Sequence, residues 1–342
     1  MEDREKRFLS GPAWIAIFVV ILIVCILASF VFGRYPVPFK QLMGIIFGKL
    51  EFLHIEKSWT DAQYIAVWNV RMPRILLAVF TGACLSAAGA AYQGVFQNPM
   101  AAPDILGASA GAGFGAALAI YLGLGSWMIT FFAFGAGLAT VAAVMLVSKY
   151  AKGEHVLSIV LAGIMVSSLL QSGTSYIKLV ADPTNKLPAI TYWLMGSLAG
   201  ATNRELGLAV WPMSAGITVL FLLRWRLNIL AAGDDDARSL GVNPDRVRLT
   251  VIISATLVTA ASVSVSGVIG WVGLVIPHMM RRLVGSDYRY LMPMSVIGGG
   301  LFLLLVDNFS RNFPGGEIPI GILTAFIGAP FFLLLITRRK HE

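Results

Sequence analysis

The residues of this chain whose types could do chemistry do not form a catalytic set. Gly107, Ser109 and Gly111 fit the G-x-S-x-G pattern of a nucleophilic serine, with His278 as a candidate base. A nucleophile elbow needs a strand before its serine, however, and Ser109 lies in an apolar stretch with a helical pattern. Residues 44–49 end in Gly-Lys but lack the spacing of a phosphate-binding loop and its following Ser or Thr. The sequence therefore favours neither hydrolysis nor a nucleotide site.

Charged and polar side chains near the apolar segments are the next candidates. Arg71 and Arg74 stand three residues apart, so on a helix they share one face. Their guanidinium groups can hold carboxylates through a planar fork, or can reach toward lipid headgroups. His278 has no acidic partner nearby in the sequence, which favours a structural hydrogen bond over a proton relay. Cys25 and Cys84 lie in apolar segments and indicate neither a disulfide nor a metal site.

These residues belong to a chain that must be embedded in a membrane. Of its 342 residues, 57% are hydrophobic and only 13% are charged, too few to surround a water-soluble core. The segment at 271–284 is short and contains Pro277, so it is a broken span that needs neighbouring helices. We expect an all-α polytopic membrane protein, one domain over residues 1–342, with about ten transmembrane helices. The apolar segments lie at 14–32, 64–90, 104–122, 127–148, 156–178, 206–223, 249–270, 271–284, 291–309 and 319–337.

The positive charges predict the orientation of the chain. The basic start of the sequence leads directly into the first apolar segment without a cleavage pattern, which indicates a first transmembrane helix rather than a signal peptide. An even number of spans puts both termini on one side, and the short loops of that side carry most of the Lys and Arg residues. By the positive-inside rule this side is the cytoplasm. The net charge of +8 therefore reflects topology and does not indicate nucleic-acid binding.

The longest highly polar stretch between two spans is residues 224–248, on the predicted cytoplasmic side. Asp234 to Asp236 fall where an N-cap would begin a short helix, and Gly241 with Asn243-Pro244 would stop it. We therefore expect two short helices with a break between them. A solvated loop is the alternative, but it would need no shelf of apolar and small residues, whereas such a shelf suits docking into a groove of another protein.

Residues 93–116 carry the most specific pattern of small and polar residues. Gly107, Gly111 and Gly115 are spaced by four, which predicts a closely packed helix interface. The turn at Gln97-Asn98-Pro99 ends one helix before the next begins, and its side-chain amides can satisfy exposed backbone groups there.

In these stretches the chain resembles the permease subunits of ABC importers for vitamin B12, haem and ferric siderophores. This is the FecCD/BtuC-like family of type II importers, and the resemblance extends from Val67 to Leu335. Met100 and Trp271 depart from the family pattern, which usually has Leu and Phe there. The matching motifs are Arg71-x-Pro-Arg74, the Gln93 to Gly115 series, the coupling segment LNILAAGDDDARSLGV from Leu227, the Gly267 to His278 block, and the blocks at 307–311 and 317–332.

The resemblance implies a BtuC-like permease that pairs with a second permease copy, in a homodimer or a heterodimer. Two separate ATPase subunits would bind ATP and Mg²⁺, so the chain itself is expected to be no enzyme and to hold no cofactor or metal. An extracytoplasmic binding protein would deliver a ferric siderophore, haem or corrinoid to a bacterial or archaeal cytoplasmic membrane. Membrane lipid surrounds the chain, and nucleic acid is not an expected partner.

The resemblance also assigns roles to single residues. It implies binding-protein docking by Arg71, Arg74 and Arg311. It places the ATPase coupling residues at Leu230, Ala231, Gly233, Asp236, Ala237, Leu240 and Gly241. It places a cytoplasmic gate at Val156 and Leu157, where the family often has hydroxyl residues. Helix packing or the pathway would involve Gln93, Asn98, Pro99, Gly107, Gly111, Gly115, Trp193, Pro277 and His278.

One alternative class is an ion-coupled secondary transporter of a small solute. Such a transporter usually places ionisable groups within broken helices near the middle of the membrane. Asp104, Asp307 and Glu317 are instead expected at helix ends, which disfavours this alternative. The cargo is not identified by the sequence, because no Met, His or Tyr cluster has the spacing of a metal or haem ligand set.

Overall fold

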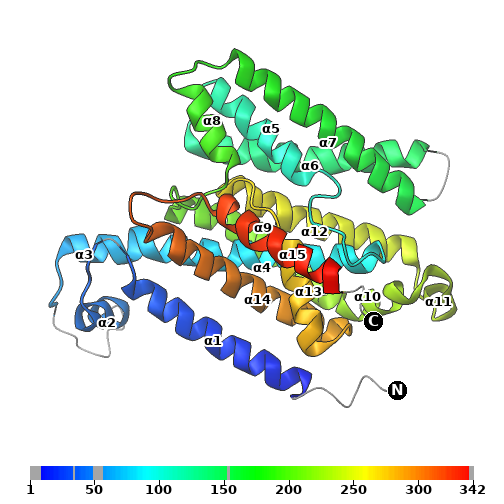
Figure 1. Ribbon diagram of the computed structural model, residues 1–342, viewed down its shortest axis with the longest axis horizontal. Coiled ribbons are helices and arrows are strands. Elements are labelled where there is room, and N and C mark those ends of the chain that lie inside the picture. The colour runs from blue at the N-terminus through cyan, green and yellow to red at the C-terminus, as the bar shows by residue number, and fades with distance from the viewer. Residues whose placement is uncertain (1–8, 34, 49–56, 152–154, 339–342) are drawn as a thin grey trace.

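The computed structural model describes residues 9–33, 35–48, 57–151 and 155–338, and every regular element in these ranges is a helix (Figure 1). The predicted all-α class is confirmed. The basic residues of the two chain ends, from Arg4 to Arg7 and from Arg339 to Lys340, lie outside the described residues. The elements are α1 (Gly11–Val31), α2 (Phe39–Phe47), α3 (Asp61–Ile65), the π-helix η3 (Ala66–Arg71), α4 (Met72–Val95), α5 (Ala108–Tyr121), α6 (Ser126–Tyr150), α7 (His155–Val180), α8 (Lys186–Leu194), α9 (Asn203–Leu222), α10 (Arg224–Ala232), α11 (Asp234–Ser239), α12 (Pro244–Ser266), α13 (Val272–Val284), α14 (Tyr288–Arg311) and α15 (Ile320–Arg338).

The predicted set of about ten spans is confirmed, although its members differ in length. Seven of the described helices are long and apolar enough to cross a membrane: α1, the continuous helix from α3 to α4, α6, α7, α9, α12 and α14. The helix α5 and the apolar part of α15 are shorter, and α13 has only 13 residues. A bilayer core of about 30 Å needs about 20 helical residues, so these three helices depend on their neighbours.

Helix α4 lies at the centre of the bundle, and 83% of the apolar window of the span that contains it is buried. It contacts α14, α12, α13 and α9. Its sequence is rich in Gly, Ala and Ser, which lets neighbouring backbones approach closely. Gly82 lies against Gly299 of α14, and Gly89 lies against Gly273 of α13. These two glycine contacts fix how near the surrounding helices come to α4.

A second group, formed by α5, α6, α7 and α8, lies along the upper side of the bundle in Figure 1. A side chain added at Gly111 or Gly115 would collide with α6, and one added at Gly107 would collide with Ser167 of α7. The tight interface predicted from the spacing of these glycines is therefore confirmed. Helix α12 joins the two groups because it packs against both α4 and α6.

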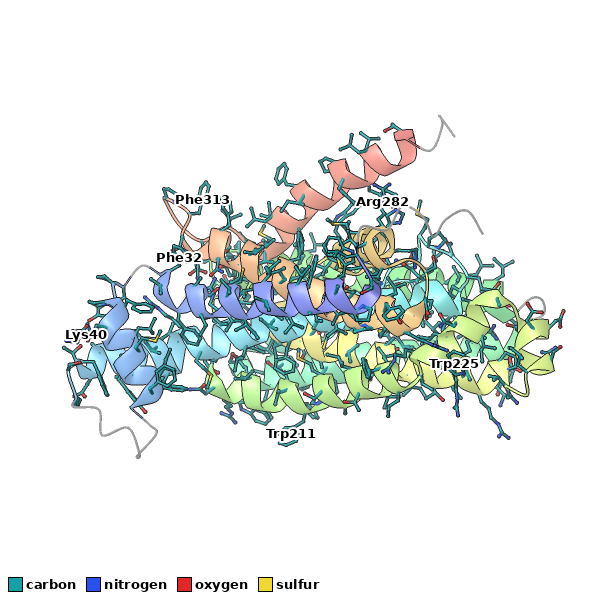
Figure 2. The ribbon with its side chains drawn as sticks, turned by 90° about the horizontal axis from the view of Figure 1, so that it is seen from below. Phe32, Lys40, Trp211, Trp225, Arg282 and Phe313 are labelled. Carbon is teal, nitrogen blue, oxygen red and sulfur yellow. The ribbon has the colours of Figure 1, made fainter. Side chains whose placement is uncertain are left out.

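Two apolar helices lie at the periphery. Helix α1 packs on α14, but only 6% of its span is buried within the chain. Helix α15 packs mainly on α13 and α14 and leaves the bundle at an angle, beyond the loop that carries Phe313 (Figure 2). Its Phe326 and Leu333 are strongly exposed, as is much of α7. These apolar faces must meet lipid or another protein.

Some helix ends differ from those predicted. Helix α12 begins five residues before the predicted span at 249–270, because the Asn243 Oδ1 accepts a hydrogen bond from the backbone N–H of Arg246 at 3.1 Å and caps it. It ends at Ser266, and an irregular segment with positive φ at Gly267 and Trp271 separates it from α13. The π-helix η3 before α4 was not predicted.

Candidate docking, coupling and pathway sites

The first candidate site surrounds Arg74, at the end of the bundle where α4 follows η3 (Figure 1). Its Nε donates to both carboxylate oxygens of Asp307 at 3.0 and 3.2 Å, and its Nη2 lies 2.9 Å from Asp307 Oδ1. Its Nη1 and Nη2 donate to the two oxygens of Glu317, each at 3.0 Å. Arg74 is only 7% exposed and Asp307 is fully buried. The charge of Arg74 is therefore compensated within the chain.

The other two predicted docking arginines lie beside this ion pair. Arg71 donates to the backbone carbonyls of Phe30 and Tyr35, and Arg311 donates to the carbonyl of Ser29 at 2.6 Å. Arg71 is 5% exposed and Arg311 is 6% exposed, so neither reaches freely toward lipid headgroups. The structure brings the three arginines together, but as a buried group rather than as an open basic patch. We call Arg71, Arg74, Arg311, Asp307 and Glu317 the arginine cluster.

An open cavity of about 530 Å³ gives access to the arginine cluster. Arg71, Arg74, Arg311 and Glu317 line it together with apolar residues of η3 and the residues that follow α1. Arg71 is the last residue of the π-helix η3, whose wider turn changes the direction of its side chains relative to a regular α-helix. The assignment of the arginines to docking stays a prediction.

The second candidate site lies at the opposite end, where α10 and α11 form the two predicted short helices (Figure 1). The break between them is at Gly233, whose φ of 137° is the region that favours glycine. Gly233 itself is the N-cap of α11, and no side chain caps this helix. The prediction of an aspartate N-cap is therefore wrong. Asp234 to Asp236 form the first turn instead, where their negative charges interact favourably with the helix dipole and stabilise the helix.

The predicted coupling residues divide into buried and exposed ones. Leu230 and Ala237 are fully buried within the chain, so they hold α10 and α11 in place rather than contact a partner directly. The Gln97 Nε2 donates to the carbonyl of Leu230 at 3.1 Å, and Arg248 pairs with Asp234 at 2.9 Å. Gly233 is half-buried. The exposed members, which we call the coupling surface, are Ala231, Asp236, Leu240 and Gly241.

The turn before α5 lies near the coupling surface. As predicted, a side-chain amide of this turn forms a hydrogen bond with an exposed backbone group. The Asn98 Oδ1 accepts from the backbone N–H of Met100 at 2.9 Å, and Pro99 is exposed beside it. Gln93 instead lies inside α4, where its Oε1 accepts from Arg281 at 2.9 Å.

The predicted gate residues begin α7. Val156 is half-buried and packs against the main core, whereas Leu157 is exposed. Trp193 of α8 packs on a small core between α5, α6 and α12. Pro277 is buried within α13. The half-buried His278 beside it interacts with another group of the chain. The gate and pathway roles of these residues stay predictions.

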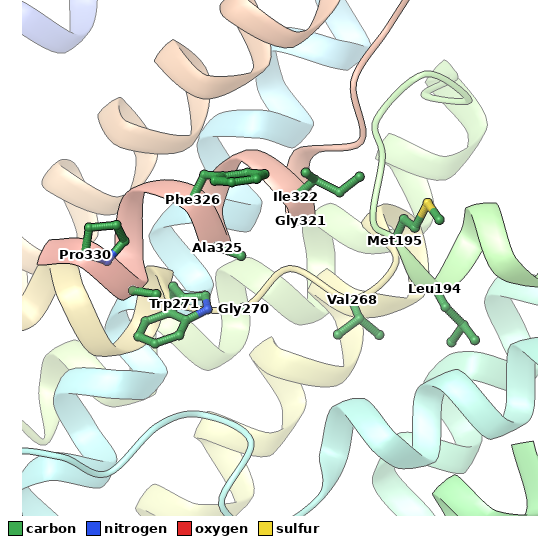
Figure 3. Close-up of a pocket in the computed structure, with 11 residues that line it drawn as sticks. Leu194, Met195, Val268, Gly270, Trp271, Gly321, Ile322, Ala325, Phe326 and Pro330 are labelled. Carbon is green, nitrogen blue, oxygen red and sulfur yellow. The ribbon is translucent and has the colours of Figure 1, made fainter. Parts of the chain in front are cut away.

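A third candidate site was not predicted from the sequence. An open, almost entirely apolar cavity of about 680 Å³ lies where the end of α8, the 267–271 segment and α15 meet (Figure 3). Trp271 of the 267–271 segment and Phe326 of α15 both line it, and Leu194 and Met195 lie at its end beside α8. Trp271 has a positive φ of 71°, and Gly328 of α15 leaves the space that its indole occupies. The motif Gly270-Trp271 is visible in the sequence, but its position facing α15 depends on tertiary packing.

Comparison with known proteins matches residues 21–338 to the model of the FecCD transport family. The chain is 36% identical over 322 residues to the molybdate import system permease protein MolB of Haemophilus influenzae, covering 94% of each chain. It is 33% identical to the hemin transport system permease protein HmuU of Yersinia pestis, covering 94% of this chain and 95% of that one. It is 40% identical over 286 residues to the cobalamin import system permease protein BtuC of Halobacterium salinarum, covering 82% and 75%.

A solved structure of a metal-chelate type ABC transporter in an inward-facing conformation has the same fold. It superposes with a TM-score of 0.84 at 35% identity, covering 96% of this chain and 99% of that chain. This chain therefore belongs to the FecCD transport family, whose members are permease subunits of ABC transporters.

Proposed function

We propose that this permease subunit imports a metal chelate across the cytoplasmic membrane, with both termini in the cytoplasm. Two copies enclose the pathway, two ATPase subunits hydrolyse ATP, and an extracytoplasmic binding protein delivers the cargo. The observation that carries the proposal is the large apolar cavity beside α15, within a chain whose family match covers residues 21–338.

The size and lining of this cavity support a chelate rather than a small oxyanion. A volume of about 680 Å³ is within the range of sites for molecules of several hundred daltons. A small anion such as molybdate would instead be held by several hydrogen-bond donors or positive groups, and the residues lining this cavity are almost all apolar. The relatives named for hemin and cobalamin carry cargo of the larger kind.

The coupling surface supports an ATPase partner at one end of the bundle. Leu240 is 68% exposed although it is a large apolar residue at the end of a six-residue helix. The fully buried Leu230 and Ala237 anchor α10 and α11 to the bundle. A movement of the ATPase subunit at Leu240 is therefore passed to the bundle through these two helices. An exposed apolar side chain on a rigid helix is the kind of group that enters a groove of another protein.

The arginine cluster supports a binding-protein partner at the opposite end. Three guanidinium groups surround one cavity, and only two carboxylates accompany them in the cluster. In a twofold dimer this cavity would occur twice, which suits a partner with two lobes and an acidic side chain on each. Arginine suits this role because its fork can bind a carboxylate through two hydrogen bonds.

The proposal is tested by transport in proteoliposomes that contain the permease, its ATPase subunits and the binding protein. We expect ATP-dependent uptake of one chelate among a ferric siderophore, haem and cobalamin, and no competition by molybdate. The variant Leu240→Glu should assemble in the membrane but fail in uptake. Uptake of molybdate without uptake of any chelate would overturn the cargo class, and purification without any ATPase subunit would overturn the assembly.

A further inference from the structure

The two carboxylates that hold Arg74 differ in their access to solvent. Asp307 is fully buried, whereas the side chain of Glu317 is 25% exposed and lines the cavity of about 530 Å³. Both carboxylates contact the guanidinium group through two oxygens, and together they use four of its five N–H donors. Because Asp307 is buried, a carboxylate from outside can bind Arg74 through two hydrogen bonds only in the place of Glu317.

The surroundings of Arg74 favour an additional negative charge. Arg71 and Arg311 donate to backbone carbonyls, so the two acids of the cluster face three positive charges. The Arg311 Nε is also buried and makes no hydrogen bond among the described residues. An entering carboxylate would thus meet positive charge that the chain does not itself balance.

The backbone before Glu317 can move more easily than the rest of the cluster. Gly315 and Gly316 have φ of 96° and 142°, and a side chain at either would meet nothing within 4 Å. Beyond Glu317 the start of α15 has two other hydrogen bonds, from the Ser310 Oγ to the carbonyl of Ile318 at 2.6 Å and from the N–H of Ile320 to the carbonyl of Gly196 at 2.8 Å. Glu317 adds a further tie, from the start of α15 to α4 across a glycine turn.

We propose that Glu317 is a latch on Arg74, and that an acidic side chain of the docking protein takes its place and loosens the start of α15. This inference rests on the proposed docking at the arginine cluster. Because Ile322 and Ala325 of α15 line the apolar cavity, the exchange would transmit docking at one end of the bundle to the wall of that cavity.

Hydrogen–deuterium exchange on the complete transporter tests the latch, with the cargo-free binding protein of the same transport system as the probe. Its docking should speed amide exchange in residues 312–323 about tenfold, equivalent to about 1.4 kcal/mol of opening free energy. Glu317→Gln should produce the same increase without the binding protein. It should also tighten docking about fivefold, since a partly exposed ion pair no longer has to be displaced.

Asp182→Asn is the matched control for the loss of one negative charge at this end of the bundle. The backbone N–H of Asn185 donates to Asp182 at 2.8 Å and lowers the pKa of its carboxyl, so this group is ionised at neutral pH. This variant should change neither exchange in residues 312–323 nor affinity.

Thermal unfolding shows whether Glu317→Gln remains folded. A folded Glu317→Gln variant with unchanged exchange and unchanged or weaker docking would overturn the latch, and so would equal gains in affinity for both variants. If the unmodified transporter hydrolyses ATP but does not bind the probe, docking at the arginine cluster fails instead. If Glu317→Gln unfolds, the test is amide exchange in residues 312–323 of the unmodified transporter. Exchange that docking leaves unchanged there would overturn the latch.

Discussion

The contact between α4 and α13 should tolerate no side chain at Gly89. A Cβ added there would lie 1.8 Å from the carbonyl oxygen of Gly273. Carbon and oxygen atoms in ordinary contact are about 3.3–3.6 Å apart, so Gly89→Ala must separate the two backbones by roughly 1.5 Å. Gly273 also lies close to Pro103, so a shift of α13 would disturb this second contact as well.

The cost of this separation follows from the lost packing. Each atom pair in contact contributes about 0.1–0.2 kcal/mol of dispersion energy, and a gap of about 1 Å already removes about half of it. A separation of roughly 1.5 Å across an interface of on the order of 50 pairs therefore loses roughly 2.5–5 kcal/mol, at or above the usual range for overpacking. We expect Gly89→Ala to unfold at a markedly lower temperature than the unmodified chain.

Thermal unfolding in detergent, followed by size-exclusion chromatography, measures this effect. Gly135→Ala in α6 is the matched control, because Gly135 is exposed, also helical, and has nothing within 4 Å of its Cβ position. It should leave stability unchanged or raise it by up to about 1 kcal/mol through helix propensity. If both variants unfold at the same temperature, the close approach of α4 and α13 does not limit stability and the reasoning is wrong.

Three further predictions concern the candidate sites. Arg74→Met should destabilise the chain by about 3–5 kcal/mol because it leaves the Asp307 charge buried without its partner, whereas adding Asp307→Leu should restore most of the loss. Thermal unfolding compares the two, and a double variant no more stable than the single one contradicts this account. Leu240→Glu should keep insertion and unfolding temperature unchanged but abolish stimulation of the ATPase; normal stimulation would exclude Leu240 from the interface. Leu157→Ser should increase solute leak through the closed transporter in vesicles, because an apolar constriction closes by dewetting, and Val156→Ser should do so less because its side chain packs on the core. Equal leak from both variants and the unmodified chain would place the gate elsewhere.

The sequence predicted the parts of this structure that depend on local pattern. Apolar runs located the seven long spans and the shorter apolar helices of the described residues, and glycines spaced by four located the interface between α5 and α6. The break at Gly233 and the turn at Asn98 follow from the conformational preferences of single residues.

The remaining features depend on residues that are distant in sequence. Asp307 and Glu317 follow Arg74 by 233 and 243 positions, so no spacing rule could reveal that this arginine is neutralised within the chain. Ala237 and Leu240 are both apolar and three residues apart, so a regular helix would place them on one face. Leu240 instead follows the last residue of α11 and is exposed, whereas Ala237 is fully buried against the bundle. The cavity beside Trp271 likewise exists only because α15 returns to the 267–271 segment.

The central place of α4 has a consequence for the biogenesis of the protein. The helix that packs most extensively on α4 is α14, which is translated about 190 residues later. At about 5–20 residues per second this is a delay of about 10–40 s. During this interval Arg74 has no carboxylate partner and Gly82 faces no helix. An arginine without a partner at the end of an apolar span is unfavourable in lipid, so α4 is better retained by the insertion machinery than released into lipid. A nascent chain interrupted before α14 would expose this arginine and its glycine-lined groove, which distinguishes an unfinished copy from a finished one in cellular quality control.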